Sequence, residues 1–475
     1  MGSEWKEVGL NDLGEVARGK SRHRPRYAEH LYGGAYPFIQ TGDVKASGGL
    51  ITNHSQTYSE DGLAQSRLWP AGTMCITIAA NIAETGILSY PACFPDSVIG
   101  FIADENKCDV RFIEYRFRYL KAQLQREAIG SVQDNINLAT FERLRFSIPA
   151  LIEQKKISNI LGSLDNKIQL NRETNQTLEA MAQALFKSWF VDFDPVFDNI
   201  IAHNLAHNNA PLHNIPEPLL PHAQRRLNVH NVGRGSARQT AAHAFHHLFP
   251  QAFEQSDEPS VGIQGWVPKG WGVKNITELA DTISNTYPLK TVDKVIFLNT
   301  GDIEAGNFLH KNYSEVSTLP GQAKKMIQKD DILYSEIRPK NKRFAYVYFD
   351  GTEHVVSTKL MVLRAKEKAN SRFVYFLLTL NKTISDLQRI AELRSGTFPQ
   401  ITYNELSLIK AAIPSDGNVL KAFSNIMLNT YYNKNLQIQA QNEELKKLRD
   451  TLLPKLISGE LRIPDAEQAT EALAK

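Results

Sequence analysis

The stretch from Leu151 to Pro195 constrains the fold most, because it has the pattern of one long helix with a narrow apolar stripe. Its seam positions follow one another in steps of four and three residues: Ile157, Leu161, Leu164, Ile168, Asn171, Asn175, Leu178, Ala182, Leu185 and Trp189. That 3.5-residue period is typical of a coiled coil. At about 1.5 Å per residue the seam is roughly 50 Å long, too long for the core of a compact domain. The helix therefore needs a partner.

A second stretch near the end of the chain can be that partner. Its seam positions again alternate steps of four and three: Met427, Tyr431, Lys434, Ile438, Gln441, Leu445, Leu448 and Leu452. Each seam has polar residues in its middle, Asn171 and Asn175 in the first, Lys434 and Gln441 in the second. Polar seam residues cost stability and fix register. We therefore expect an antiparallel pair with the polar layers in contact. Two unrelated surface helices are the alternative.

The composition is that of an ordinary globular protein. A chain of 475 residues predicts two to four domains, and it is 42% hydrophobic and 22% charged. It has no 18-residue apolar run, and MGSEWKEVGL lacks a signal-peptide core, so we expect a cytoplasmic protein without a membrane partner. The three cysteines lack metal-ligand spacing. Because the net charge is only +3, nucleic-acid binding would require local basic patches.

Gly14, Gly19, Lys20 and Ser21 have the spacing of a phosphate-binding loop. Such a loop follows a buried strand and opens a helix, yet the preceding segment is half polar and Pro25 falls in the expected second turn. A nucleotide-binding protein that uses Gly19, Lys20 and Ser21 is therefore one alternative function.

The same segment can also be a basic arm. Cations occupy every second position, so in an extended chain they would line one face and suit phosphates: Arg18, Lys20, Arg22, Arg24 and Arg26. A solvated run of charges remains the plain alternative.

The rest of the first 150 residues predicts a β-rich domain. Short apolar runs such as YPFIQ, GTMCITIAAN and SVIGFIAD predict strands, with turns at Thr41-Gly42-Asp43 and Pro70-Ala71-Gly72. Residues 111 to 128 predict a helix, and Leu144 to Ile148 a strand. Pro95-Asp96 with Glu105-Asn106-Lys107 forms a loose metal-nuclease pattern, which arises often by chance.

Residues 196 to 262 hold most of the thirteen histidines. His243, His246 and His247 could share one side of a helix, but no cysteine or carboxylate cluster accompanies them. We therefore expect an extended connector rather than a metal site.

The second half of the chain repeats the first. Three pairs of segments correspond: Trp5 to Leu13 with Trp271 to Leu279, Phe38 to Asp43 with Phe297 to Asp302, and Ile136 to Pro149 with Ile401 to Pro414. Gly19, Lys20 and Ser21 correspond to Asn285, Thr286 and Tyr287, and the second copy has no nuclease pattern. The fold therefore does not depend on either enzyme motif.

Three segments give the chain a specific resemblance: WFVDFDPV closing the first long helix, GWVPKGW opening the second domain, and LRDTLLPKLISGEL at the end. With the repeat, they resemble the specificity subunit of a type I restriction-modification enzyme. The fold class expected is α+β, with two repeated β-rich target recognition domains separated by two long antiparallel coiled-coil helices. The expected parts are a first recognition domain (1–150), a first spacer helix (151–195), a His-rich connector (196–262), a second recognition domain (263–414), a second spacer helix (415–459) and a tail (460–475).

The resemblance implies a DNA-recognition subunit without catalysis of its own. In this family each recognition domain reads one half of a split double-stranded DNA site, and two modification subunits dock to form an adenine N6-methyltransferase. S-adenosylmethionine, ATP and Mg are expected in partner subunits, and whether a restriction or translocase subunit joins stays open. Asp194-Pro195-Val196-Phe197 lacks the second proline of the adenine-methyltransferase motif, and Gly233-Arg-Gly235 is too short for a methyl-donor site. We expect no catalytic, cofactor-binding or metal-binding residue in this chain.

DNA contacts are expected from cations and amides in both recognition domains. Besides the basic arm, the cationic candidates are Lys290, Arg338, Lys340, Lys342 and Arg343. Arg and Lys bind phosphates and guanine, and Asn and Gln bind adenine, which adds Gln133, Asn135 and Gln400. A coiled-coil scaffold without DNA specificity is the other alternative function.

Overall fold

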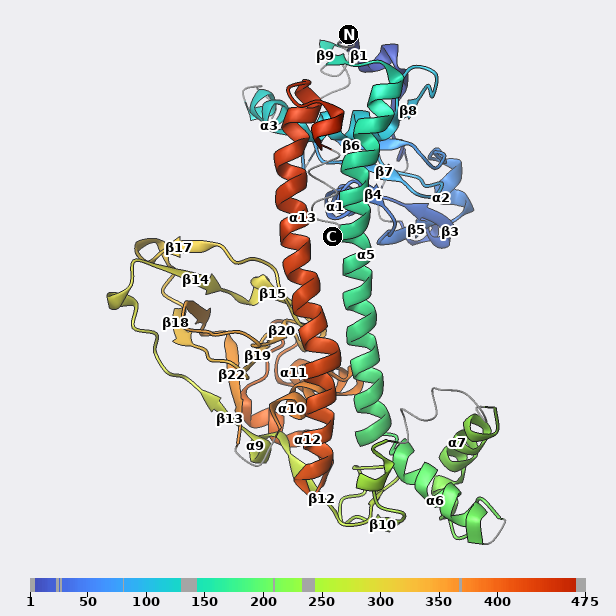
Figure 1. The fold of residues 1–475 in the computed structure, drawn as a ribbon, viewed down its shortest axis with the longest axis vertical. Helices are drawn as coiled ribbons and strands as arrows, with labels where there is room; N and C mark the ends of the chain where they lie inside the picture. The colour runs from blue at the N-terminus through green and yellow to red at the C-terminus, as the bar shows by residue number, and fades with distance from the viewer. Residues whose placement is uncertain are drawn as a thin grey trace. The chain divides into compact units, whose positions relative to one another are not determined.

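The computed structural model describes residues 5–22, 25, 28–79, 81–129, 143–207, 210–232, 244–366 and 370–466 (Figure 1). The chain forms two compact units, Met1–Glu173 with Gln439–Lys475, and Thr174–Ile438. The boundaries fall inside α5 (Leu151–Phe190) and α13 (Asn433–Ser458). Each unit therefore joins a mixed helix-and-sheet domain to segments of both long helices. Within the described residues, no helix is long and apolar enough to cross a membrane.

The first unit is organised around a five-stranded sheet. Its order is β2 (Gly14–Arg18), β8 (Val98–Ala103), β6 (Met74–Thr77), β7 (Thr85–Leu88) and β4 (Leu50–Ile51). Neighbouring strands are antiparallel except β7 and β4, which are parallel. All residues of β6 and β7 are buried, as expected for central strands that are covered on both faces.

The remaining elements of this unit frame the sheet. The strand pairs are β1 (Lys6–Gly9) with β9 (Arg145–Ile148) and β3 (Tyr32–Phe38) with β5 (Gln56–Tyr58). The helices are η1 (Leu10–Asp12), η2 (Glu29–Leu31), α1 (Thr41–Ala46), α2 (Glu60–Ala64) and α3 (Val110–Ile129). The helix predicted at 111–128 and the strand predicted at 144–148 are confirmed. The turn predicted at Thr41 is wrong, because Asp43 accepts the Gln40 N–H and caps a short helix there.

The second unit repeats this plan. Its four-stranded sheet has the order β13 (Ala280–Ile283), β22 (Leu360–Ala365), β19 (Ile332–Ser335) and β20 (Phe344–Tyr346). By position in the repeat, these strands correspond to β2, β8, β6 and β7. The pair β12 (Trp271–Asn275) and β23 (Lys410–Pro414) corresponds to β1 and β9, and Gly272 pairs with Ile413 as Lys6 pairs with Ile148. The predicted repeat is confirmed at the level of strand order and register.

The other elements of the second unit extend it. A further sheet has the order β17 (Tyr313–Glu315), β14 (Lys294–Leu298), β21 (His354–Ser357) and β18 (Ala323–Met326), and a hairpin joins β15 (Ile303–Glu304) to β16 (Asn307–Phe308). β10 (Phe253–Gln255) pairs with β11 (Trp266–Pro268). The helices are α9 (Ile276–Leu279), η5 (Leu289–Thr291), η6 (Thr300–Asp302), η7 (Val316–Thr318), η8 (Pro339–Asn341), α10 (Ser371–Thr379), α11 (Asn381–Arg394) and η9 (Tyr403–Leu408).

The long helices pair antiparallel within the first unit. Asp165 of α5 bonds Arg449 of α13, whereas Asn171, further along α5, bonds residues earlier in α13. Asn171 Nδ2 donates to Gln441 Oε1 and to Asn442 Oδ1, each at 2.9 Å. Buried seam residues on both helices share one core: Ile157, Leu161, Leu164 and Ile168 with Leu445 and Leu452. The antiparallel pairing and its polar layer at Asn171 and Gln441 are confirmed.

The second long helix is not uniform. α12 (Gly417–Ile426) leads into a π-helical turn, η10 (Met427–Tyr432), before α13 begins. A π turn carries one extra residue per turn, so it shifts the seam from the 3.5-residue pattern. Lys434 is exposed, and Asn175 Oδ1 is buried with no hydrogen-bond partner among the described residues. The expected polar contact between Asn175 and Lys434 is therefore not formed.

The prediction of an extended connector at 196–262 is wrong. α6 (Asp194–His207), η3 (Glu217–Leu219), α7 (Leu220–Val232) and η4 (His246–Leu248) lie in this region. Phe197 and Ile201 of α6 are fully buried, and Phe197 packs 4.7 Å from Phe253 between ring centroids. The spacing of these apolar residues is helical, a signal that the histidine-rich composition obscured. Asp194 begins α6, four residues after α5 ends at Phe190.

The buried polar layer generates a prediction about stability. Replacing Asn171 by Leu removes both donated hydrogen bonds and leaves the buried Asn442 amide oxygen without this donor. We expect the free energy of unfolding to fall by about 1–3 kcal/mol. The double variant Asn171→Leu/Asn442→Leu replaces the pair by apolar contact and should recover most of that loss. Urea unfolding of the two single variants and the double variant measures the coupling, and additive losses would contradict the account.

Candidate nucleic-acid interface

The basic arm begins at the end of β2 and continues as an extended segment. Along Arg18, Gly19, Lys20, Ser21 and Arg22 the residues alternate between exposed and buried, and the three cations are exposed. Arg18 Nε donates to the Asp96 carbonyl at 3.0 Å, and Lys20 N–H donates to the Phe94 carbonyl at 3.1 Å. The predicted extended face is confirmed for these three cations, so the arm presents them to solvent from a fixed backbone.

The phosphate-loop interpretation of this segment is wrong. Gly14 lies in β2 opposite Ala103, and after Ser21 the next helical element in the described chain is η2 at Glu29. A Cβ at Gly19 would lie 2.3 Å from the Pro95 carbonyl oxygen and 2.4 Å from that of Phe94. The glycine is thus required by close packing against a neighbouring backbone. Over the described residues 19–22, no helix begins that could hold a phosphate at Lys20.

The nuclease pattern does not form a metal site either. Asp96 precedes β8 and Glu105 follows it, so the six residues of this strand separate them. At about 3.3 Å per strand residue the two carboxylates are on the order of 20 Å or more apart. They cannot bind one metal ion together.

Four candidate cations of the second unit lie around the short helix η8: Arg338, Lys340, Lys342 and Arg343. The helix is flanked by Arg338 with φ 43° and Lys342 with φ 53°, both in the left-handed region that non-glycine residues rarely adopt. Arg338 N–H donates to the Pro399 carbonyl at 3.0 Å, and Ile337 forms a β-bridge with Gln400. The structure therefore brings Gln400 to the same turn as the cations. Strained backbone of this kind is concentrated at functional sites.

The side chains at this turn differ in how they are held. Arg338 and Lys342 are exposed and have no hydrogen bond or ion pair from their side chains within the described residues. Lys340 Nζ lies 3.9 Å from Glu392, a long ion pair that is weak in solvent. Arg343 donates to the Ile303 carbonyl at 3.1 Å and is only partly exposed. Arg338 and Lys342 are thus the cations most available for a ligand.

The other candidates are placed separately or lie outside the described residues. Lys290 is exposed on η5, in the connection between β13 and β14. That connection is the counterpart of the one between β2 and β3, which carries Lys20 and Arg22. Four candidates lie outside the residues that the structure describes: Arg24, Arg26, Gln133 and Asn135.

Sequence reasoning missed one exposed aromatic residue beside this turn. Phe398 is 49% exposed and directly precedes Pro399, whose carbonyl oxygen accepts from Arg338. Its signal in the sequence was a large aromatic residue inside the turn-forming segment SGTFPQ. Exposed aromatic rings can stack on or wedge between nucleic-acid bases.

A family model described as "Type I restriction modification DNA specificity domain" matches residues 2–180 and again 268–447. The two matches cover more than half of the chain, and each spans one copy of the repeat. The segment between them contains α6 and α7.

Curated relatives are specificity subunits. The chain is 41% identical over 181 residues to the "Type I restriction enzyme HindI specificity subunit" of Haemophilus influenzae, which covers 36% of this chain and 39% of that protein. The match thus spans less than half the length of that relative. The chain is also 22% identical over 481 residues to the MjaIX specificity subunit of Methanocaldococcus jannaschii. That alignment covers 97% of this chain and 94% of that protein.

Solved structures give a weaker likeness. The S subunit of a type I restriction-modification system from M. genitalium has a TM-score of 0.47 at 14% identity, with 96% of each chain covered. The HsdS subunit from Thermoanaerobacter tengcongensis has a TM-score of 0.32 at 13% identity, with 96% of this chain and 97% of that chain covered.

The packing around Gly19 generates a prediction that distinguishes a structural role of this segment from nucleotide binding. Gly19→Ala should lower the free energy of unfolding by more than about 1 kcal/mol, because the added Cβ meets two carbonyl oxygens. Lys20→Ala should leave stability within about 0.5 kcal/mol, because Lys20 is exposed. Neither variant should change ATP or GTP binding, measured by calorimetry, from the undetectable level expected of the unmodified chain. Tight nucleotide binding that Lys20→Ala abolishes would contradict this account.

Proposed function

Because the chain belongs to the family of type I restriction-modification DNA specificity proteins, we propose that it recognises a split, asymmetric DNA sequence for such a system. The observation that supports this proposal most is the repeat itself. The same strand order, β2-β8-β6-β7 and β13-β22-β19-β20, occurs in two units that carry different loops. One scaffold used twice with different surfaces suits a protein that reads two different half-sites.

The antiparallel helices supply the symmetry that such reading requires. Two antiparallel helices run in opposite directions, which is the symmetry of an approximate two-fold axis between the helices themselves. Double-stranded DNA presents half-sites in the same way, about 34 Å or one helical turn apart. Because the two domains differ in sequence, the two half-sites differ as well, and the full site is asymmetric.

The candidate contacts divide into positioning and reading groups. Arg18, Lys20 and Arg22 present three cations along an extended segment, a spacing that suits successive phosphates. In the second domain Arg338 and Lys342 extend from a turn that also holds Gln400. An Arg at a base edge reads guanine, and a Gln reads adenine. The turn around η8 is therefore the base-reading element that we propose for the second half-site.

Catalysis is assigned to partner subunits. Two modification subunits would bind S-adenosylmethionine and methylate adenine at N6, and a restriction subunit, where present, would use ATP and Mg to cleave unmodified DNA. The sequence supports this division, since Asp194 begins a motif that lacks the second proline needed to hold a flipped adenine. Asp194 and Pro195 also begin α6, where Asp194 accepts from Ser188 and Arg225. Its carboxylate is thus engaged in holding the turn between α5 and α6.

Domain exchange tests the proposed function. Replacing residues 263–414 with the corresponding domain of a related specificity subunit should change one half of the methylated sequence and leave the other half unchanged. The matched exchange of residues 1–150 should change the opposite half. Both are measured by mapping methylated adenines after the exchanged chain is assembled with its modification subunits. If either exchange changes both half-sites together, the two domains are not independent readers.

A further inference from the structure

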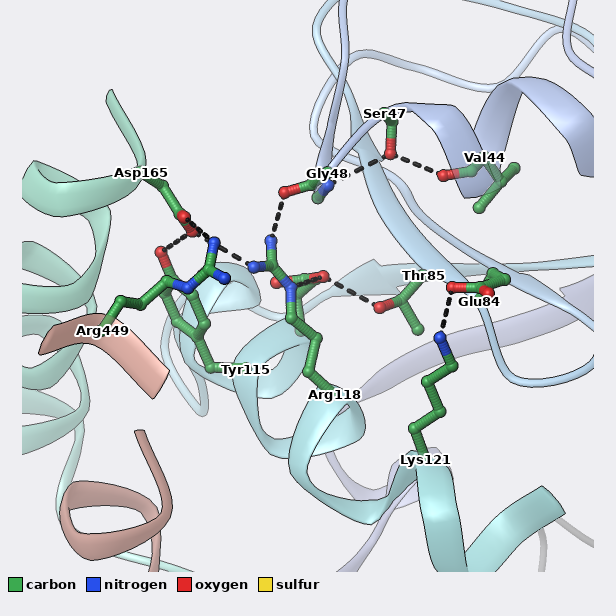
Figure 2. Close-up of polar contacts among 12 residues, drawn as sticks. Val44, Ser47, Gly48, Glu84, Thr85, Tyr115, Arg118, Lys121, Asp165 and Arg449 are labelled. Carbon is green, nitrogen blue, oxygen red and sulfur yellow. Dashed lines mark hydrogen bonds and ion pairs between the residues drawn. The ribbon is translucent and has the colours of Figure 1, made fainter. Parts of the chain in front are cut away.

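One carboxylate joins three elements of the first unit. Asp165 lies on α5 and accepts from Tyr115 and Arg118 of α3 and from Arg449 of α13, as Figure 2 shows. The Tyr115 hydroxyl donates to Oδ2 at 2.8 Å, an Arg118 NH1 donates to the same oxygen at 3.2 Å, and an Arg449 NH1 donates to Oδ1 at 2.8 Å. α3 belongs to the β-rich domain, so this side chain connects that domain to both long helices.

Arg118 extends the connection into the sheet and its loops. Its Nε donates to Glu114 at 2.6 Å, and its second terminal nitrogen donates to the Gly48 carbonyl at 2.7 Å, in the loop between α1 and β4. Glu114 in turn accepts from the Thr85 hydroxyl of β7 at 2.8 Å. The guanidinium therefore has a fixed partner in each of three directions, which specifies its orientation.

Burial makes these contacts strong. The side chains of Asp165, Arg118 and Arg449 are 16%, 21% and 21% exposed, and that of Glu114 is 2% exposed. Burial by itself would lower the pKa of Arg118, but the neighbouring Glu114 and Asp165 outweigh burial and raise that pKa. Burial raises the pKa of Glu114 against the opposing effect of Arg118. Charge-assisted hydrogen bonds in such surroundings are directional and costly to break singly.

The corresponding contact in the second unit has a different character. There α10 packs on the long helices through aromatic rings: Phe373 and Phe376 lie 5.3 and 5.8 Å from Phe186 of α5, and Phe376 lies 5.8 Å from Phe423 of α12. Among the described residues of α10, Arg372 bonds the neutral Ser424 hydroxyl of α12 at 2.9 Å. Apolar aromatic packing tolerates small shifts better than a set of charge-assisted bonds does. The two domains are thus held by different physical means.

The polar network also adjoins a cavity of about 190 Å³, whose lining includes Arg111, Arg118, Arg172, Arg449, Glu114 and Asp165. This volume is large enough for several water molecules, and its lining is strongly polar. A side chain substituted within the network can therefore shift without steric conflict.

We propose that Asp165, with Tyr115, Arg118 and Arg449, is a positioning network that fixes the angle of the first recognition domain against the helix pair. In this way it sets which gap between the half-sites is accepted. The inference rests on the proposed function, since it concerns the same split-site reading. Its specific content is that gap selection depends on a carboxylate–guanidinium contact that includes none of the candidate DNA-contacting residues.

The test uses the full complex with its modification subunits and a set of DNA duplexes. All duplexes carry the same two half-sites, and the gap between them varies one base pair at a time around the preferred length. The variants are Arg118→Met, which removes the bonds to Asp165, Glu114 and Gly48, and Tyr115→Phe, which removes one hydroxyl. The matched control is Asp450→Asn: Asp450 also accepts from Arg449, is 62% exposed and has no bond to α3 among the described residues.

For Arg118→Met we expect the methylation ratio between the preferred gap and its neighbours to fall about tenfold, the scale of the charge-assisted contact to Asp165, which is the one lost bond that joins α3 to α5. Tyr115→Phe should give a smaller fall, and Asp450→Asn none. Thermal unfolding of each variant identifies a general loss of stability. Equal loss of methylation at every gap, or an unchanged gap ratio in Arg118→Met, would overturn the inference. An unmodified complex that methylates all gaps equally would instead refute the proposed function.

Discussion

The pairing of α5 with the C-terminal helices is the interaction on which the rest of the structure depends. In the first unit, seam residues such as Leu161 and Leu164 share a core with Leu452 and with Phe112 of α3. In the second unit, Phe186 and Phe190 of α5 share a core with Phe423 of α12 and with the strands of the sheet. Neither core is complete without both helices, although the helices lie far apart in the sequence. The helix pair is therefore part of each domain's interior as well as a link.

This shared interior explains how a protein can vary its surface and keep its architecture. The central strands of both sheets are buried, and their order is the same in the two units. The loops and turns that differ, such as the extended segment after β2 and the turn around η8, lie at the edges of those sheets and present cations to solvent. Changes there cost little burial, whereas changes in the seam or central strands cost core packing. Under the proposed function, reading and scaffolding are thus carried by different residues.

The sequence predicted those features that arise from periodic or repeated local patterns. The 3.5-residue stripe predicted the helix pair and its polar layer at Asn171, and the repeat predicted the common strand order. The resemblance drawn from the helix motifs is likewise confirmed by the family match. The phosphate-loop interpretation was wrong because Gly19 is required by close backbone packing. That packing is visible only in the structure, where Phe94 and Pro95 lie beside Gly19. The prediction of an extended connector was wrong because its histidine-rich composition obscured the helical spacing of apolar residues such as Phe197 and Ile201.

Other features could not be predicted from one sequence. The π turn at Met427–Tyr432 has no clear signal in the local sequence. It includes a tertiary contact, since the ring centroids of Tyr432 and Tyr346 lie 5.3 Å apart. The Asp165 network joins Tyr115, Arg118 and Arg449 across long separations, and Asp165 lies outside the seam positions that periodicity identifies. Its residues have the composition of any solvated helix face. Only the fold shows that they converge on one carboxylate.

The proposed function implies that the helix pair which joins the two recognition domains also sets the gap between their half-sites, and lengthening both helices together tests this most directly. Four residues inserted after Asn175 and four after Ile438 add about 6 Å to each and nearly preserve the facing of their side chains. In cells carrying this variant, mapping of methylated adenines should show the same two half-sites with a gap longer by one or two base pairs, at about 3.4 Å per pair. A four-residue insertion between the exposed His213 and Asn214 should leave the gap unchanged. An unchanged gap with full activity in the lengthened variant would contradict the claim.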